Sequence, residues 1–335
     1  MQSNVLLNKG IMIIEERELP KPGKGQVRIK TVLAGICGSD IHALHGLQPS
    51  LTFPRVMGHE LVGIVDALHE TDGLSSIQIG DRVAIDPSFR CGICELCKTG
   101  KENICNNLEV LGVHCDGGFS NYFICNSDMI HLLPAQLTFE DAVFCEPLSI
   151  ATHAISRMHS TKRKKAAIIG AGPIGLALLL GLKEIFDEVI VFELLENRKD
   201  SARSIGASKV FDSKEDSYLL EDIDVVFDSV SVPETCRISE RIVRRGGEVI
   251  IVGMAKPNIG FSLLTILKKE LTITGTRMTT REDFKAALGL LKRIDSSKIQ
   301  MIITGCWPLS NSIEGIHHVE KNSDKCIKEI IDCRE

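Results

Sequence analysis

The sequence predicts an α/β protein with two domains, one rich in antiparallel strands and one built on a doubly wound parallel sheet. At 335 residues the chain is too long for one comfortable core. Short β-branched segments interrupted by glycine, such as 26–34 and 61–67, are typical of an antiparallel β domain. From residue 166 onward strand-like and helix-like segments alternate, which favours parallel strands joined by crossover helices.

Composition and charge exclude several classes of protein. The chain is 44% apolar and 25% charged, as in folded globular proteins, and its net charge of -5 argues against a phosphate-backbone binder. We interpret the basic run 162–165 as a solvated loop. Neither a signal peptide nor a run of about 18 apolar residues is found. We therefore expect a cytoplasmic protein with no nucleic-acid or membrane partner.

The elements of the first half continue in the same style. DRVAIDP (81–87) and GGFSNYFIC (117–125) are short, strand-like and bounded by glycine or proline. The second half begins with a strand and an apolar helix at 166–185 and continues with strand-like segments at 188–193, 224–230 and 271–277. Segment 282–294 has the pattern of a helix, and the tail after it no longer has the alternating pattern. We expect this tail to return to the first domain.

The motif GAGPIG (170–175) matches the dinucleotide-binding fingerprint and lies between an apolar strand and an apolar helix. Gly170 permits the tight turn, Gly172 lets the backbone approach a pyrophosphate, and Gly175 lets the helix pack closely on the strand. Pro173 and Ile174 complete the loop. A glycine turn without a ligand is the alternative, and the strand and helix around it favour the nucleotide.

The next strand-like segment, EVIVFE, ends at Glu193, about twenty residues after the glycines. An acidic side chain there can accept hydrogen bonds from ribose hydroxyls and would repel a 2′-phosphate. The sequence therefore predicts NAD in preference to NADP.

Four cysteines, Cys91, Cys94, Cys97 and Cys105, stand within one loop. Their spacing supplies four soft ligands, as a tetrahedral structural zinc requires. An iron–sulfur cluster is the main alternative. In either case the ligand shell is complete, so this metal performs no chemistry.

A second group of candidate ligands comes from GICGSDIH (35–42), PRVMGHE (54–60) and FCEPLS (144–149). These segments offer one thiol, one imidazole and two carboxylates: Cys37, His59, Glu60 and Glu146. A catalytic zinc has about three protein ligands and an open position. Taken singly, each residue also has a structural interpretation, as a buried thiol, a hydrogen-bonded core histidine or a helix cap.

In this order and at these separations, the motifs GICGSDIH, GHE, the cysteine loop, EPLS and GAGPIG resemble the zinc-dependent medium-chain dehydrogenases along nearly the whole chain. The chain resembles most the sorbitol, threonine and galactitol-phosphate dehydrogenase branch, and PRVMGHE and GVHCDGGFSNY resemble its sugar-acid 5-dehydrogenases and starvation-sensing members. The resemblance implies a GroES-like catalytic domain at 1–148 with a structural zinc lobe at 91–105. It further implies a Rossmann NAD domain at 149–284 and a return to the catalytic domain at 285–335.

The resemblance also assigns roles. It implies that Cys37 and His59 bind the catalytic zinc, that Glu60 and Glu146 share or exchange the remaining protein position, and that Asp40 orients the histidine. Ser39 matches the hydroxyl that takes the substrate's proton, His42 matches a histidine that passes it outward in some members, and Arg198 matches a position near the adenosine. Cys145, beside Glu146, departs from the pattern and offers a thiol that competes for the metal.

The resemblance implies a zinc-dependent, NAD-linked enzyme that interconverts a secondary alcohol and a ketone on a sugar acid or polyol. One catalytic and one structural zinc are expected per chain, in a homodimer or homotetramer. A sugar acid needs a cation for its carboxylate, and the candidates are Arg55, Arg277 and, more weakly, His114. Structural roles for the two arginines are the alternative.

Other functions stay open or are excluded by particular positions. A polyol or polyol-phosphate dehydrogenase is the nearest alternative, and a catalytically silent NAD-binding sensor is the alternative outside enzymology. Zinc hydrolysis needs a second histidine four residues after His59, and that position is Gly63.

Overall fold

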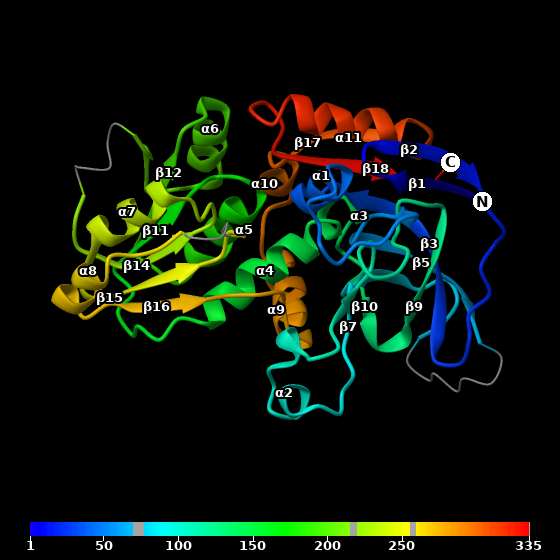
Figure 1. Ribbon diagram of the computed structural model, residues 1–335, viewed down its shortest axis with the longest axis horizontal. Helices are drawn as coiled ribbons and strands as arrows, with labels where there is room; N and C mark the ends of the chain where they lie inside the picture. The colour runs from blue at the N-terminus through cyan, green and yellow to red at the C-terminus, as the bar shows by residue number, and fades with distance from the viewer. Residues whose placement is uncertain (70–76, 215–219, 255–258, 335) are drawn as a thin grey trace. The chain divides into compact units, whose positions relative to one another are not determined.

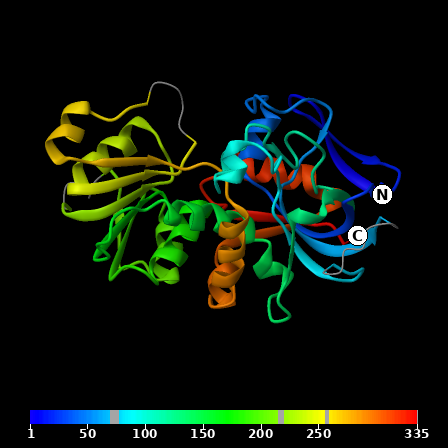
Figure 2. The ribbon, with the colours of Figure 1, turned by 90° about the horizontal axis from the view of Figure 1, so that it is seen from below.

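The computed structural model describes residues 1–69, 77–214, 220–254 and 259–334, and the chain divides into two compact units (Figure 1). Unit 1 consists of Met1–Glu146 and Thr280–Glu335, and unit 2 of Pro147–Thr279. The domain boundaries predicted from the sequence lie at 148/149 and 284/285. The second view, in Figure 2, shows the strands of both units from below.

Unit 1 is organised around the ten-residue strand β3. Its last five residues, from Thr31 to Gly35, are all buried. This strand pairs antiparallel with β5, β9 and β18 within a seven-stranded sheet. Six of the strands follow the order β10-β6-β5-β3-β18-β17, and the seventh, β9, pairs with β3 outside this order. The strands are β3 (Gln26–Gly35), β5 (Glu60–Leu68), β6 (Arg82–Ile85), β9 (Tyr122–Asn126), β10 (Ile130–Leu132), β17 (Ile303–Pro308) and β18 (Lys328–Asp332). A three-stranded sheet contains β1 (Gln2–Asn8), β2 (Ile11–Glu16) and β4 (Arg55–Val56), and a two-stranded sheet contains β7 (Ser88–Phe89) and β8 (Glu109–Val110).

The C-terminal segment completes the sheet of unit 1. Strand β17 runs parallel to β18, and β18 pairs antiparallel with β3 through Ile330↔Gly35 and the two pairs that follow. The N-terminal strand is joined to the same segment, because Asn4 Nδ2 donates a hydrogen bond of 2.7 Å to Ser312 Oγ. Both ends of the chain therefore build one core, which includes Val5, Ile29, Ile85, Phe119 and Ile331.

The helices of unit 1 are short and lie between or after its strands. They are α1 (Gly38–Leu44), α2 (Glu95–Lys98), η1 (Glu102–Ile104), η2 (Ser127–Met129), α3 (Phe139–Ala142), α9 (Arg281–Leu291), α10 (Ser296–Gln300), η3 (Leu309–Asn311) and α11 (Ser312–Lys321). Helix α4 (Cys145–Ser156) begins in unit 1 and continues into unit 2.

Unit 2 contains the predicted doubly wound sheet, and its six strands are all parallel. Their order, β13-β12-β11-β14-β15-β16, is the 3-2-1-4-5-6 order of dinucleotide-binding folds. The strands are β11 (Lys165–Ile169), β12 (Glu188–Glu193), β13 (Lys209–Asp212), β14 (Ile223–Asp228), β15 (Val243–Ile251) and β16 (Thr272–Gly275). The crossover helices are α5 (Pro173–Leu182), α6 (Glu196–Ile205), α7 (Pro233–Ile242) and α8 (Leu263–Lys269).

In the part of the chain that the structure describes, no helix is long and apolar enough to cross a membrane.

Candidate active site and cysteine cluster

Two antiparallel strands bring the candidate zinc ligands together. Cys37 follows the end of β3 and is the N-cap of α1, while His59 and Glu60 stand at the start of β5. The pairing of Gly35 with Glu60 places these two ends side by side. A Cβ at position 35 would lie 2.0 Å from Glu60 Oε2, so any larger residue there would push the Glu60 carboxylate out of place. As a result, ligand atoms of Cys37, His59 and Glu60 all lie within 4.8 Å of one another.

The first turn of α1 supplies the polar groups around this cluster. Cys37 N donates a 2.8 Å hydrogen bond to Asp40 Oδ2, and the other oxygen of Asp40 lies 3.8 Å from His59 Nδ1. On the other side of the ring, Ser39 Oγ lies 3.4 Å from His59 Nε2. His42, on the same helix, is exposed. The helix therefore places a hydroxyl and a carboxylate at opposite nitrogens of one imidazole.

The cluster has the chemistry of a metal site. The pKa of His59 is raised well above its usual value, because the charges of Cys37 and Asp40 outweigh the burial that would lower it. His59 Nδ1 is buried and has no hydrogen-bond partner among the residues that the structure describes. A thiol, an imidazole and carboxylates gathered in a buried site are the donor set of a catalytic zinc, whose charge would balance the excess of acidic groups.

Lys328 is the residue of this site that sequence reasoning missed. From β18 its Nζ donates to both oxygens of Glu60 at 2.7 Å and to Ile36 O at 2.9 Å. The lysine side chain is 4% exposed and that of Glu60 is 2% exposed, so this is a buried ion pair. The one local signal was a lysine among the apolar residues of CIKEIIDC (326–333), which also contains Glu329 and Asp332. Glu60 is thus engaged by a cation as well as lying beside the candidate ligands.

Glu146 and Cys145, at the start of α4, are both buried. Burial raises the pKa of Glu146 to about 7, and Glu146 lies outside the group of ligand atoms found within 4.8 Å of one another among the described residues. Burial raises the pKa of the Cys145 thiol well above its usual value. Since the thiolate is the metal-binding form, this shift disfavours Cys145 as a competing ligand.

The four-cysteine loop is closed around one point. The Sγ–Sγ distances are 3.5 Å for Cys91–Cys105, 3.9 Å for Cys94–Cys105 and 4.0 Å for Cys91–Cys97. Tetrahedral Zn–S bonds of about 2.3 Å would place sulfurs roughly 3.8 Å apart, so the loop fits a single four-coordinate ion. Backbone N–H groups lower the pKa of Cys94 to about 6, whereas burial raises the pKa of Cys97 to about 12, so a bound metal would have to displace the proton of Cys97.

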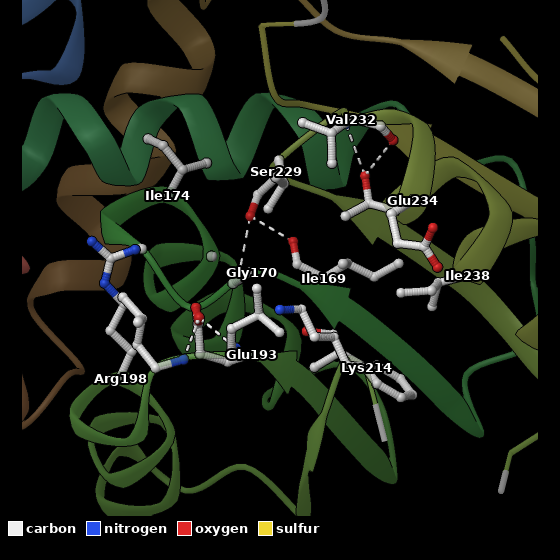
Figure 3. A pocket seen from close by; sticks show the side chains of 18 of the residues that line it. Ile169, Gly170, Ile174, Glu193, Arg198, Lys214, Ser229, Val232, Glu234 and Ile238 are labelled. Carbon is white, nitrogen blue, oxygen red and sulfur yellow. Dashed lines mark hydrogen bonds between the residues drawn. The ribbon is translucent and has the colours of Figure 1, made fainter. Parts of the chain in front are cut away.

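The glycine loop of unit 2 borders a cavity of about 660 Å³ (Figure 3). Helix α5 begins there, with Gly172 as N-cap and Pro173 at its first position. Gly175 packs so closely on the loop that a Cβ would lie 1.9 Å from Gly170 O. The lining includes all the predicted nucleotide residues, and it adds Lys214, Ser229, Val230, Val232, Glu234, Thr235 and Ile238, which carried no sequence signal.

Glu193 is bound to the backbone of this loop. One oxygen accepts the N–H of Ala171 at 2.7 Å, and the other accepts those of Leu194 at 2.6 Å and Leu195 at 3.0 Å. A carboxylate has about four acceptor positions, so these three bonds leave one direction for a ribose hydroxyl. Figure 3 shows Lys214 and Arg198 on either side of Glu193.

The three candidate partners for a substrate carboxylate differ in their surroundings. Arg55 Nη2 donates to Thr52 Oγ1 at 2.8 Å, and Nη1 lies 3.3 Å from Asp116 Oδ1. His114 is exposed, and its Nδ1 accepts the Val110 N–H at 3.0 Å. Arg277 is exposed and follows β16. The contacts of Arg55 agree with the alternative that this arginine has a structural role.

Comparison with known proteins gives two matches to family descriptions. Residues 23–135 match the alcohol dehydrogenase GroES-like domain, and residues 173–293 match the zinc-binding dehydrogenase family. The first match contains the cysteine loop together with His59 and Glu60, and the second begins inside the glycine loop.

Full-length relatives are also found. The starvation-sensing protein RspB of Escherichia coli (strain K12) is 31% identical, over 99% of each chain. The L-galactonate-5-dehydrogenase of the same strain is 31% identical, over 96% of this chain and 95% of its own. The crystal structure of a short chain alcohol dehydrogenase (rspB) from E. coli CFT073, complexed with NADH, superposes with a TM-score of 0.90 at 29% identity and covers 99% of both chains.

Proposed function

This chain belongs to the zinc-binding alcohol dehydrogenase family, and from that premise we propose that it interconverts a secondary alcohol and a ketone on a sugar acid, with NAD as the hydride carrier. We assign catalysis to the unit made of Met1–Glu146 and Thr280–Glu335, and NAD binding to Pro147–Thr279. A polyol substrate is the nearest alternative. The cytoplasm is the proposed location.

One observation carries the proposal. The Cys37, His59 and Glu60 ligand atoms converge within 4.8 Å in a buried site, and a hydroxyl, Ser39 Oγ, reaches the same histidine. This arrangement combines a metal site with a group that can move a proton. The same chain holds a glycine-loop cavity with an acidic residue at its edge, as a dinucleotide requires.

The two cofactors supply the parts of the reaction that side chains cannot. Cys37, His59 and a carboxylate would hold zinc, which would supply Lewis acidity that makes an alcohol proton easier to remove. NAD, held by the glycine loop and Glu193, supplies the hydride acceptor.

Side chains of α1 then carry the substrate's proton toward solvent. In our proposal the Ser39 hydroxyl accepts the proton of the substrate and donates its own toward water or His42, which is exposed on the same helix. Asp40 lies 3.8 Å from His59 Nδ1, where its negative charge favours the ring orientation that turns Nδ1 toward it. Lys328 balances the charge of Glu60, which in our proposal shares or exchanges the third ligand position with Glu146.

The cysteine loop has a structural role in this proposal. With four sulfurs around one point, its metal has no open position for a substrate. Fully loaded protein should therefore contain two zinc ions per chain. Metal analysis that found one would remove either the catalytic or the structural site.

A sugar acid is proposed as substrate because a full-length relative is named L-galactonate-5-dehydrogenase and because the sequence offers two arginines, Arg55 and Arg277, as candidate partners for a carboxylate. Arg55 would have to leave Thr52 and Asp116 to bind a substrate. An arginine binds both oxygens of a carboxylate with its planar fork, which distinguishes a hexonate from the corresponding hexitol.

The test is a screen of hexonates and hexitols for NADH formation with zinc-loaded protein. We expect a higher kcat/KM for a hexonate than for its hexitol, and Arg277→Ala should reduce this ratio by a factor that corresponds to about 1.5–3 kcal/mol. Arg55→Ala serves as the comparison variant. Equal rates on sorbitol and gulonate would favour the polyol alternative, and absence of turnover on every compound would favour the NAD-binding sensor.

We also propose that the protein is a homodimer or homotetramer, with one contact at the edge of the unit 2 sheet. Strand β16 ends that sheet, and the helix before it, α8, exposes Leu263 (77%), Leu264 (60%) and Leu267 (75%). An edge strand beside an apolar surface favours association with a second copy. Leu264→Asp together with Leu267→Asp should lower the mass measured by light scattering, whereas an unchanged mass would place the contact elsewhere.

A further inference from the structure

The cysteine loop is joined to the start of helix α9 by one carboxylate. Glu102, between Cys97 and Cys105, accepts the backbone N–H of Arg281 at 2.7 Å with Oε1 and Arg281 Nη1 at 2.6 Å with Oε2. Arg281 is the first residue of α9, so its N–H is one of the donors that a helix leaves without an internal partner. A carboxylate at this end also meets the positive end of the helix dipole.

Further contacts hold both sides of this link. Arg281 Nη2 donates to Asp128 Oδ2 at 2.5 Å. On the loop side Arg90, directly before Cys91, holds Asp86 with contacts of 2.7 and 3.3 Å, and its Nε lies 4.0 Å from Glu102 Oε1. The side chains of Arg90 and Asp86 are fully buried. The entry and the exit of the cysteine loop therefore belong to the same network as Arg281.

Arg281 lies where the chain returns from unit 2 to unit 1. The chain re-enters unit 1 at Thr280, which is the N-cap of α9 and forms a capping box with Asp283. The residue after it is the one that Glu102 binds. The point of re-entry is thus fixed on one side by its own cap and on the other by the cysteine loop.

We propose that the metal of the cysteine cluster and the first turn of α9 are energetically coupled through the Glu102–Arg281 pair. The metal then positions the returning chain in addition to closing its own loop. The inference rests on the proposed metal in the cluster, because a bound ion fixes Cys97 and Cys105 and so fixes Glu102, whose carbonyl also accepts the Cys105 N–H at 3.1 Å. Such coupling is reciprocal: if the metal stabilises the pair, breaking the pair weakens metal binding by the same factor.

The test measures metal affinity with a chelating dye in a Cys37→Ala background, in which the cysteine cluster is the remaining proposed site. Arg281→Met changes a residue outside the loop, and we expect about tenfold weaker zinc binding. Glu102→Gln should have a similar effect, and the double variant should be no weaker than either single one. Lys285→Met is the control, because Lys285 lies on the same helix and forms an exposed ion pair with Glu282.

A second measurement needs no substitution in the network. Hydrogen exchange of the amides at 280–284 should be faster in Cys97→Ser protein than in zinc-loaded wild type. Zinc affinity in Arg281→Met within about twofold of its background, or unchanged exchange at 280–284, would overturn the coupling. A Cys37→Ala protein that binds no zinc would instead overturn the proposed structural metal site, and the coupling with it.

Discussion

Replacing Lys328 by methionine should destabilise unit 1 strongly while keeping the length and shape of the side chain. The substitution removes the ammonium that bonds both oxygens of Glu60 and the carbonyl of Ile36. Glu60 would then be a buried carboxylate without its cation, 2% exposed and beside Cys37.

The expected magnitude follows from the geometry. At 2.7 Å and an effective dielectric constant of about 20, the direct attraction between the two charges is roughly 6 kcal/mol. Desolvation of both groups cancels much of this value in the intact protein, but removal of one partner leaves the cost of burying the other. We therefore expect Lys328→Met to lower the free energy of unfolding by about 3–5 kcal/mol in zinc-free protein.

The chain provides its own reporter for this experiment. Its single tryptophan, Trp307, lies on β17, pairs with Ile331 and donates to Glu329 at 2.8 Å. Tryptophan fluorescence during urea titration therefore follows unit 1. Lys328→Met with Glu60→Gln removes both charges and should recover much of the loss. The control Lys285→Met, in an exposed pair, should change stability by less than about 0.5 kcal/mol.

Two results would refute this reasoning. A loss below about 1 kcal/mol in Lys328→Met would mean that the pair is not a buried ion pair in solution. A double variant as unstable as the single one would mean that the loss comes from packing and not from an unpaired carboxylate.

The remaining predictions concern the metals, the cofactor and pH. Cys37→Ala should abolish turnover with little change in thermal stability, whereas Cys97→Ala should lower the melting temperature because a structural metal contributes folding energy; equal losses of stability would contradict the two roles. Wild-type protein should prefer NAD to NADP, and Glu193→Ala should narrow the ratio of the two kcat/KM values; an initial preference for NADP would show that the repulsion argument is wrong. Burial, with Lys285, Arg90 and Arg281 nearby, lowers the pKa of His131 from 6.5 to about 4. The unfolded state then binds the proton of His131 more tightly. The contribution of His131 to stability is therefore fully present above about pH 6.5 and is lost as the pH falls through 4. In zinc-free protein, His131→Gln should make the decrease in the free energy of unfolding between neutral and acid pH smaller by about 2–3 kcal/mol, as measured by Trp307 fluorescence. An unchanged pH profile would assign this decrease to other groups.

The parts of the site that could be predicted are those encoded by local spacing. The glycine loop needs small residues at fixed offsets between a strand and a helix, and the cysteine loop needs four thiols within one short segment. The family resemblance implied the separate candidate ligands Cys37, His59, Glu60 and Glu146 by their order along the chain, and the ligand atoms of the first three lie within 4.8 Å of one another. Glu193 was expected as an acid at the end of its strand, which is where β12 ends.

The parts that could not be predicted depend on distant pairing. Lys328 lies 268 residues from Glu60; the return of the tail to the first domain was expected, but the sequence did not specify that β18 pairs with β3 and brings Lys328 to Glu60. The same holds for Arg281 and Glu102, which are 179 residues apart. The three backbone bonds to Glu193 depend on the exact turn of the glycine loop, and a pattern of residue types does not specify that turn.

The insertion of β18 beside β3 also determines when the molecule can be finished during synthesis. Unit 2 is one continuous segment and can fold as soon as it leaves the ribosome, whereas unit 1 has its first strands at one end of the chain and its last at the other. At about 5–20 residues per second, the 268 residues between Glu60 and Lys328 take roughly 15–50 s to synthesise. For that interval Glu60 lacks its lysine and β3 lacks a neighbour, so the surroundings of the candidate zinc ligands are complete only after β18 has been made.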